Sequence, residues 1–205
     1  YQLAVQNTKA SVVAVLFSSN PVFVTILAFI FLKEAIHKNN IAALIFEVIG
    51  TIIIINPLNV NLSVLGIALA ILSTITFALY GVFGKKKCVK YGGIVVTCFG
   101  FLFGSLEILI LIALSHVTFI AAWFSSNGLA MFSNIPLFKG YSLGVLPIIL
   151  YICIINSGIG FACYFTAMEK TSAQTTSLVF FFKPILAPIL ALILLHEAIP
   201  MNMLI

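Results

Sequence analysis

Hydrophobic positions in this chain fall in long, almost unbroken runs, and polar residues occur mainly between the runs. A helix that crosses a membrane needs about 20 predominantly apolar residues. Six runs approach or reach that length, and they predict helices over residues 10–33, 40–57, 63–84, 93–114, 142–166 and 173–196. The pattern therefore predicts an all-α polytopic membrane protein.

Helix-breaking and charged residues separate these runs. Asn56-Pro57 ends the second run, Lys85-Lys86-Lys87 ends the third, and Gly92-Gly93 precedes the fourth. The only long connection, residues 115–141, carries aromatic residues among Ser and Asn, which indicates a segment at the membrane interface. No signal peptide is recognisable, and the start at Tyr1 leads us to expect a longer protein.

Two stretches of the chain match one another at a constant shift of 163 positions. We call Tyr1–Ile36 the first copy and Tyr164–Ile199 the second copy. Each has an entry Tyr, a Pro inside the apolar run and a terminal Leu-x-Glu-Ala-Ile in the same register, which predicts an internally repeated membrane protein. The identical pairs are Tyr1/Tyr164, Ala4/Ala167, Thr8/Thr171, Ala10/Ala173, Phe17/Phe180, Pro21/Pro184, Leu27/Leu190, Ala28/Ala191, Leu32/Leu195, Glu34/Glu197, Ala35/Ala198 and Ile36/Ile199.

Composition supports the membrane class. The mean hydropathy is +1.25, and only 7% of residues are charged, whereas a soluble domain needs about a quarter to cover its surface. The net charge of +5 comes from Lys alone and sits near the ends of the runs, so no nucleic-acid partner is expected. The four cysteines show no metal-ligand spacing and predict free, buried thiols; no metal or other cofactor is expected.

The lysines also predict the orientation of the chain. Counting alternate connections, seven lysines (residues 33, 38, 85, 86, 87, 90 and 170) fall on one side and two (residues 9 and 139) on the other. This bias places the Lys85–Lys90 turn in the cytoplasm. The runs that hold the two copies are the first and sixth, so the copies are predicted to cross in opposite directions, as in many secondary transporters.

The motifs of the two copies resemble a known family. Ser18-x-x-Pro21-x-Phe23 and Leu32-Lys33-Glu34, followed by a run that bears Gly50, are similar to the EamA-type repeat of the drug/metabolite transporter superfamily. The second copy repeats this pattern as Phe182-Lys183-Pro184 and Leu195-His196-Glu197.

This resemblance implies a fold of ten helices in two inverted five-helix repeats. Six of these helices are visible here: residues 1–57 would be the C-terminal part of the first repeat, and residues 63–205 the second repeat without its last helix. The implied function is efflux or exchange of a small organic metabolite or drug by alternating access in the plasma membrane. The expected partners are that solute and the lipid bilayer, and a homodimer is left open.

Polar residues at helical spacing supply the first candidates for solute contact. Ser73, Thr76 and Tyr80 share one face of the third run, and Asn156 and Tyr164 share a face of the fifth. Hydrogen bonding between helices explains such faces equally well. The resemblance favours solute contact, because members of the family build their central cavity from these helices.

Lys183 is the strongest candidate, since it lies near the middle of the sixth run, where a cation is costly unless it is paired. Thr176 shares its face, and its equivalent in the first copy is Asn20. We expect this Lys to hold an anionic solute group. The alternative is a permanent structural ion pair with the intramembrane Glu107, which is itself a candidate for proton coupling or a neutral structural residue.

Prolines inside the two copies predict kinks. Pro21, Pro184 and Pro188 each remove a backbone donor and free a carbonyl one turn earlier. Such kinks occur without a function, but at matched depths in inverted copies they favour hinges beside the solute site. Glu34 and Glu197 end their runs symmetrically and are interpreted as structural residues.

Enzymatic chemistry is not expected. The sequence lacks His-Glu-x-x-His, Cys-x-x-Cys and Gly-x-Ser-x-Gly, and it contains neither Asp nor Arg. The alternative to a transporter is a non-transporting membrane scaffold, whose polar residues would serve only helix packing. A water-accessible cavity lined by Tyr80, Asn156 and Lys183 would separate these two interpretations.

Overall fold

The computed structural model describes residues 1–8, 10–36, 38–55, 63–137, 139, 142–183, 186 and 193, and within these ranges every regular element is helical. The prediction of an all-α polytopic membrane protein is confirmed. Four of the described helical stretches are long and apolar enough to cross a membrane: Val12–Leu32, Val64–Tyr91, Gly93–Ser115 and Leu146–Lys170. Two shorter apolar helices, Asn40–Ile53 and Ala173–Phe182, fall in the second and sixth predicted runs.

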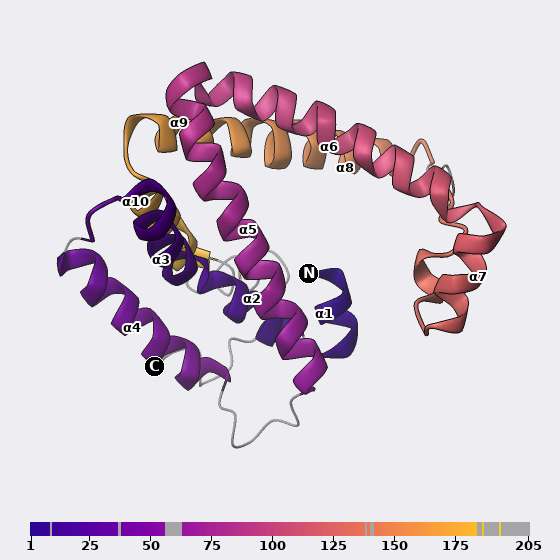
Figure 1. The fold of residues 1–205 in the computed structure, drawn as a ribbon, viewed down its shortest axis with the longest axis horizontal. Helices are drawn as coiled ribbons and strands as arrows, with labels where there is room; N and C mark the ends of the chain where they lie inside the picture. Colours follow the sequence, from indigo (N-terminus) through magenta and orange to yellow (C-terminus); the bar gives the residue numbers. More distant parts are fainter. Residues whose placement is uncertain are drawn as a thin grey trace. The chain divides into compact units, whose positions relative to one another are not determined.

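The chain forms two compact units. The first unit combines Tyr1–Lys90 with Ala167–Ile205, and the second comprises Tyr91–Thr166. The helices of the first unit are α1 (Gln2–Asn7), α2 (Ala10–Ser18), α3 (Asn20–Leu32), α4 (Lys38–Ile55), α5 (Val64–Tyr91), α10 (Ala173–Ser177) and the 3₁₀ helix η3 (Leu178–Phe182) (Figure 1).

The second unit is built on two long helical rods that lie side by side (Figure 1). One rod is α6, and in the other α8 continues through the π-helix η2 into α9. Thr97 of α6 donates a hydrogen bond to the Phe161 carbonyl of α9 at 3.4 Å, and the rings of Phe101 and Phe161 are 5.4 Å apart. The elements are α6 (Gly93–Ser115), α7 (Thr118–Ser126), η1 (Ala130–Phe132), α8 (Leu146–Leu150), η2 (Tyr151–Ile159) and α9 (Gly160–Lys170), whose last turn belongs to the first unit.

A glycine allows the two rods to approach closely. A Cβ added at Gly93, the first residue of α6, would stand 2.5 Å from backbone atoms of Phe165 and Thr166. Only a residue without a side chain fits there. The neighbouring Gly92 has φ 88°, a left-handed conformation that glycine adopts at no steric cost. These two glycines separate α5 from α6, as the sequence predicts.

The third helix ends later than predicted, and the helices of the two copies are interrupted where continuous helices were predicted. The third helix does not stop at Lys85-Lys86-Lys87 but continues to Tyr91, because Lys is a good helix former and only Gly92 breaks the backbone pattern. The long helix expected in the first copy is interrupted at Ser19, between α2 and α3. In the second copy α10 gives way after Ser177 to a 3₁₀ turn. The predicted stop at Pro57 lies outside the described residues.

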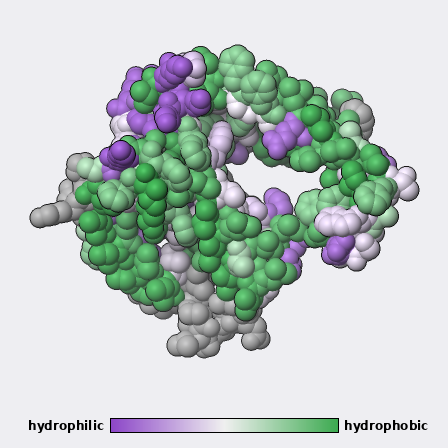
Figure 2. Space-filling view, in the orientation of Figure 1, coloured by the Kyte–Doolittle hydropathy of each residue, from purple (hydrophilic) through white to green (hydrophobic). Residues whose placement is uncertain are grey.

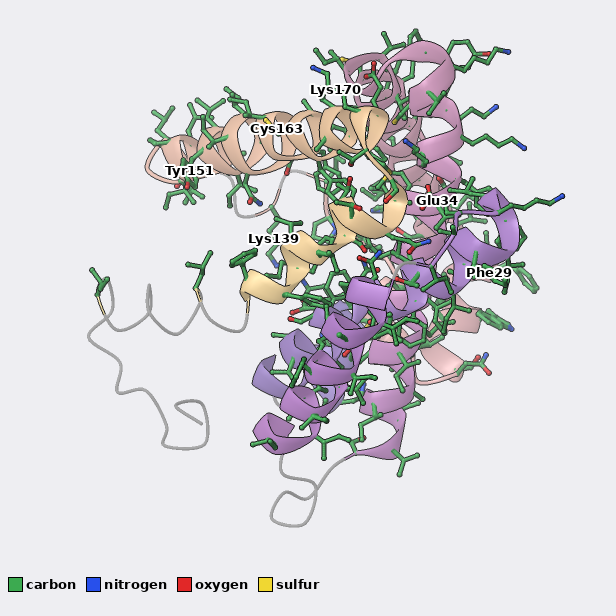
Figure 3. All side chains as sticks on the ribbon, turned by 90° about the vertical axis from the view of Figure 1, so that its left-hand side faces the viewer. Phe29, Glu34, Lys139, Tyr151, Cys163 and Lys170 are labelled. Atoms are coloured by element: carbon green, nitrogen blue, oxygen red, sulfur yellow. The ribbon has the colours of Figure 1, made fainter. Side chains whose placement is uncertain are left out.

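Small residues form the buried core of the first unit. Val24 and Ala28 of α3 pack against Ala78 and Val82 of α5 and against Ala173 of α10, and all five are fully buried. Many large apolar side chains point outward; for example, Phe29 of α3 is 56% exposed and projects from its helix (Figure 3). The visible surface is correspondingly hydrophobic over most of its area (Figure 2). This inside-out distribution suits a protein whose solvent is lipid.

The cysteines are free, as predicted, but only Cys88 is buried. Cys98, Cys153 and Cys163 are exposed on the described surface. Their burial was predicted wrongly, because apolar runs in a membrane protein face lipid as readily as protein.

The two copies have equivalent helix ends. α1 ends at Asn7 and α9 at the equivalent Lys170, while α2 begins at Ala10 and α10 at the equivalent Ala173. The turns between them share a hydrogen bond: Thr8 N–H donates to the Ala4 carbonyl and Thr171 N–H to the Ala167 carbonyl, both at 3.0 Å. The sequence repeat is thus also a repeat of local structure.

These equivalent turns lie near opposite ends of α5. A Cβ at Gly66 would stand 2.8 Å from the Thr8 side chain, whereas Lys85 Nζ donates to the carbonyls of Met168, at 2.6 Å, and Thr171. Gly66 and Lys85 are separated by 19 positions, which correspond to about 28 Å of helix. The two copies therefore run in opposite directions past α5.

Candidate functional site

The turn between α9 and α10 is held by two charged residues of complementary sign. Lys85 Nζ donates to backbone carbonyls at the C-terminal end of α9. The Glu34 carboxylate accepts hydrogen bonds from the N–H groups of Ala173 at 3.1 Å and Gln174 at 3.5 Å, in the first turn of α10 (Figure 3). A cation at a helix C-terminus and an anion at a helix N-terminus both interact favourably with the helix dipole.

Gln174 extends this contact between the two copies. Its side chain is 1% exposed, and its amide nitrogen donates to the carbonyls of Glu34 at 3.5 Å and Ala35 at 3.4 Å. Its amide oxygen accepts from Asn40 Nδ2 of α4 at 3.1 Å. Residues after α3 are thereby tied to the start of α10. The structural role predicted for Glu34 agrees with these bonds, and Glu197 lies outside the described residues.

An aromatic cluster lies where the two copies meet. The equivalent rings of Phe17 and Phe180 are 6.4 Å apart and perpendicular, and Phe77 of α5 lies 5.3 Å from the first and 5.5 Å from the second. Tyr80, one turn further along α5, lies 6.2 Å from Phe77. Equivalent residues of the two copies thus contact one another in this cluster.

Lys183 projects over the cluster. Its Nζ lies 5.1 Å from the centre of the Phe17 ring and 4.8 Å from that of Phe180. Cation–π contacts of this kind contribute about 0.5–2 kcal/mol. Among the described residues of its own unit, no carboxylate lies at ion-pair distance from this ammonium group. The two rings contact the Lys183 ammonium group without accepting conventional hydrogen bonds from it, so its N–H groups can still donate to a solute.

Asn20, the equivalent of Lys183, is fully buried at the start of α3. Neither its amide nitrogen nor its amide oxygen has a hydrogen-bond partner among the described residues. A buried polar group left unpaired costs about 1–3 kcal/mol, so a native protein keeps one only for a reason. The structure thus places a cation and an unpaired amide at equivalent positions of the two copies.

The helix interruption lies directly before these groups in the first copy. Ser19 separates α2 from α3, and Pro21 occupies the first turn of α3, where its missing N–H does least harm. The break is therefore a feature of the described structure, while its action as a hinge stays a prediction. Pro184 and Pro188 lie outside the described residues.

Other predicted residues of the first unit have local roles or lie away from the core. The Thr76 hydroxyl donates to the Ser73 carbonyl of its own helix at 2.9 Å. The Thr176 hydroxyl bonds the Ser172 carbonyl at 3.0 Å and the Thr171 hydroxyl at 2.9 Å. Tyr80 is 38% exposed, and its ring lies beside that of Phe77. Their contact with solute stays a prediction.

Three predicted residues belong to the second unit. Asn156 is exposed in the π-helix η2, and the Tyr164 ring packs against Phe165 with ring centres 5.5 Å apart. Glu107 is exposed on α6, and a Cβ added at the nearby Gly104 would meet nothing within 4 Å. This face of α6 therefore has open space beside Gly104 within the described structure.

Sequence reasoning missed several residues. Phe77 has no counterpart in the repeat, and nothing in its local sequence distinguishes it from the other 18 phenylalanines. Gln174 could have been suspected, since an amide in an apolar run requires partners. No gathering of three His, Cys or Glu side chains that could hold a metal ion occurs among the described residues.

The model of the EamA-like transporter family matches residues 1–56 and 64–205. The chain belongs to this family. This family assignment agrees with the resemblance drawn from the Pro- and Glu-bearing motifs. Together with the apolar helices, it indicates that the chain is part of a multi-pass membrane protein. No solved structure matches the chain.

Curated relatives carry the same description. An uncharacterized transporter of Clostridium kluyveri is 36% identical over 210 residues, which cover 100% of this chain and 62% of that protein. An uncharacterized transporter of Archaeoglobus fulgidus is 26% identical, over 95% of this chain and 62% of its own length. The uncharacterized transporter YyaM of Bacillus subtilis is 25% identical, over 87% and 54%. This EamA-like chain thus spans less than two thirds of the length of these relatives.

Proposed function

We propose that this chain is the greater part of a secondary transporter that moves a small organic solute, by efflux or exchange, across the plasma membrane. Its two inverted copies would alternate access to a site at the aromatic cluster. The Lys85–Lys90 turn would face the cytoplasm, in keeping with the distribution of Lys. Family membership and the names of the relatives support transport; the solute and the mechanism are our own inference.

The observation that carries this proposal is the buried amide of Asn20. Its donor and its acceptor are both unpaired among the described residues, and it occupies the position equivalent to Lys183. A group that binds solute must lack a permanent partner, whereas a group that only packs helices together would have one. This difference favours a transporter over a membrane scaffold.

The chemistry around the cluster suits a solute with an anionic end and an apolar body. Lys183 would attract the anionic group, and the rings of Phe17, Phe77 and Phe180 would contact the body. Amino acids and related zwitterions fit this description. Tyr80, Ser73, Thr76 and Thr176 on the same unit, and Asn156 and Tyr164 on the other, are retained as further candidates for polar contact.

The geometry of the copies supports alternating access. They run in opposite directions past α5 and meet at equivalent residues, which is the arrangement that allows two symmetry-related conformations. The interruption at Ser19 beside Pro21 provides a place where backbone angles can change. Pro184 and Pro188 would act in the same way in the second copy, and Glu107 remains a candidate for proton coupling.

Uptake measurements on the full-length protein in lipid vesicles test the proposal. The probes are radiolabelled amino acids and monocarboxylates. Asn20→Leu should abolish uptake while the free energy of unfolding stays level or rises, because an unpaired buried amide is removed. A helix-packing Asn would behave in the opposite way, so lower stability with full uptake would contradict the proposal.

Lys183→Met is the second arm of this experiment. Losing a hydrogen bond to a charged group costs about 1.5–3 kcal/mol, so apparent solute affinity should fall by about tenfold to 150-fold. Lys170→Met, at the exposed end of α9, is the matched control and should retain affinity. If Lys183 instead forms a structural pair with Glu107, Lys183→Met alone should lower stability and the added Glu107→Gln should restore it. Unchanged affinity in a well-folded Lys183→Met protein would remove this residue from the site.

A further inference from the structure

Glu47 lies in the middle of α4, and its side chain is partly buried. Both of its carboxyl oxygens are buried, and neither has a hydrogen-bond partner among the described residues. The Ser19 side chain is the polar group beside this carboxyl, although it does not reach hydrogen-bond geometry. A carboxyl group in the apolar interior of a membrane protein is thus placed next to the interruption of the first copy.

Among the described residues, the helices beside this carboxyl contribute no charged group that compensates it. α4 packs against α2, and neither α2 (Ala10–Ser18) nor α3 (Asn20–Leu32), the helices on either side of Ser19, contains a titratable residue. On α4 itself, the only other titratable residue is Lys38, at its first position, nine residues before Glu47. An ionised carboxylate in such surroundings is unstable unless a cation joins it.

We propose that Glu47 is a proton-binding site whose occupancy is linked to the helix interruption at Ser19. A proton is the smallest cation that neutralises the carboxyl in place, and it also gives the group a donor. The Ser19 hydroxyl beside the carboxyl would be an acceptor for that donor. Pro21 has no N–H, so the Phe17 carbonyl one turn earlier lacks its usual helical donor, and we take it as a second candidate acceptor.

Loss of the proton would convert Glu47 from a donor into an acceptor that carries a charge. Ser19 would then donate to the carboxylate. The Phe17 carbonyl, beside the interruption, would lose the carboxyl group as a hydrogen-bond donor. Proton binding would in this way bias the conformation of the first copy close to Asn20, which gives a physical route from a proton to the solute site. This inference rests on the proposed transport function.

Glu107 makes a weaker proton site in this structure. Its side chain is exposed on α6, and a Cβ added at Gly104 one turn away would meet nothing within 4 Å. Glu47, in contrast, combines burial, the absence of a partner among the described residues and proximity to a backbone break. These features distinguish the two intramembrane carboxyls and make them a matched pair for an experiment.

Infrared difference spectroscopy between acid and alkaline buffers tests the inference on the full-length protein in lipid films. The wild type should show a carbonyl stretching band of a buried, protonated carboxyl that disappears as the pH rises. Glu47→Gln should lack this band, and Glu107→Gln should keep it. If Glu47→Gln does not fold, Glu47→Asp serves instead and should shift the band, because it changes the position of the carboxyl but not its chemistry.

The possible outcomes of this experiment test the proton site at Glu47 separately from the proposed transport function. A titrating band that survives in Glu47→Gln, or its absence from the wild type, would overturn the proton site even if solute uptake is observed. A band whose amplitude follows sodium concentration at constant pH would also overturn it, in favour of a metal cation. If uptake fails while Glu47→Gln alone removes the band, the proton site stands and the transport proposal fails. If both hold, the ratio of uptake with and without a pH gradient should fall to unity in Glu47→Gln.

Discussion

Replacing Glu34 with Ala should weaken the attachment of the first copy to α10. The carboxylate accepts hydrogen bonds from two backbone N–H groups, those of Ala173 at 3.1 Å and Gln174 at 3.5 Å. Both donors belong to the first turn of a helix, where backbone N–H groups have no partner within the helix itself. Loss of these two hydrogen bonds should therefore lower the stability of the whole first unit.

The magnitude follows from what remains at this helix end. Loss of an N-terminal cap costs about 0.5–2 kcal/mol, and loss of the favourable interaction between a carboxylate and the helix dipole costs about 0.3–1 kcal/mol. Ser172 continues to cap α10 by accepting from Thr175 N–H at 3.0 Å, and the 3.5 Å contact is weak. We therefore expect Glu34→Ala to lower the free energy of unfolding by about 1–2 kcal/mol.

Thermal unfolding in detergent, followed by helical circular dichroism, measures this loss. For a protein of this size each kcal/mol lowers Tm by about 2–4 °C, so Glu34→Ala should lower Tm by about 2–8 °C. Glu34→Gln keeps a hydrogen-bond acceptor but loses the charge, so its Tm should lie about halfway between those of the wild type and Glu34→Ala. Glu107→Ala, at an exposed carboxylate, is the control and should leave Tm unchanged. Equal Tm values for Glu34→Ala and Glu107→Ala would refute the reasoning.

Two further predictions concern packing and orientation. Gly93→Ala should destabilise the protein by about 1–3 kcal/mol because its Cβ would meet backbone at 2.5 Å, whereas Gly104→Ala, with open space around it, should be neutral or stabilising; denaturant unfolding of both variants decides. In a Cys88-free background, a cysteine at Lys86 should be shielded from an impermeant thiol reagent in intact cells and one at Ser126 should react, because one span lies between them; reversed labelling would invert the predicted topology.

The sequence by itself determined the class and the repeat of this protein. A membrane-spanning helix bonds its own backbone and meets lipid, so its existence depends on the length of an apolar run and on little else. The match between Tyr1–Ile36 and Tyr164–Ile199 predicted the inverted copies. Helix ends at equivalent positions agree with a repeat, and the turns of the two copies contact α5 near opposite ends.

The ends of helices were predicted less well, for a physical reason. Lys85-Lys86-Lys87 ends the apolar run, but three lysines do not break a helix, so α5 continues to Tyr91. Hydropathy predicts where a chain leaves lipid, whereas backbone conformation decides where a helix stops. The break at Ser19 could be expected near Pro21, but its position could not.

For the site, the sequence identified single residues and the tertiary structure supplied their surroundings. Lys183 and Asn20 stand out in the sequence because polar groups in apolar runs are costly. That Lys183 lies over two equivalent rings, and that the amide of Asn20 is unpaired among the described residues, depends on which helices pack together.

The same holds for Glu34 and Glu47. Glu34 meets N–H groups about 140 positions further along the chain, and Glu47 faces a break in another helix. Local sequence fixes which groups a helix carries. Only packing between distant segments fixes which of them find partners, and the carboxyl of Glu47 and the amide of Asn20 found none in the described chain.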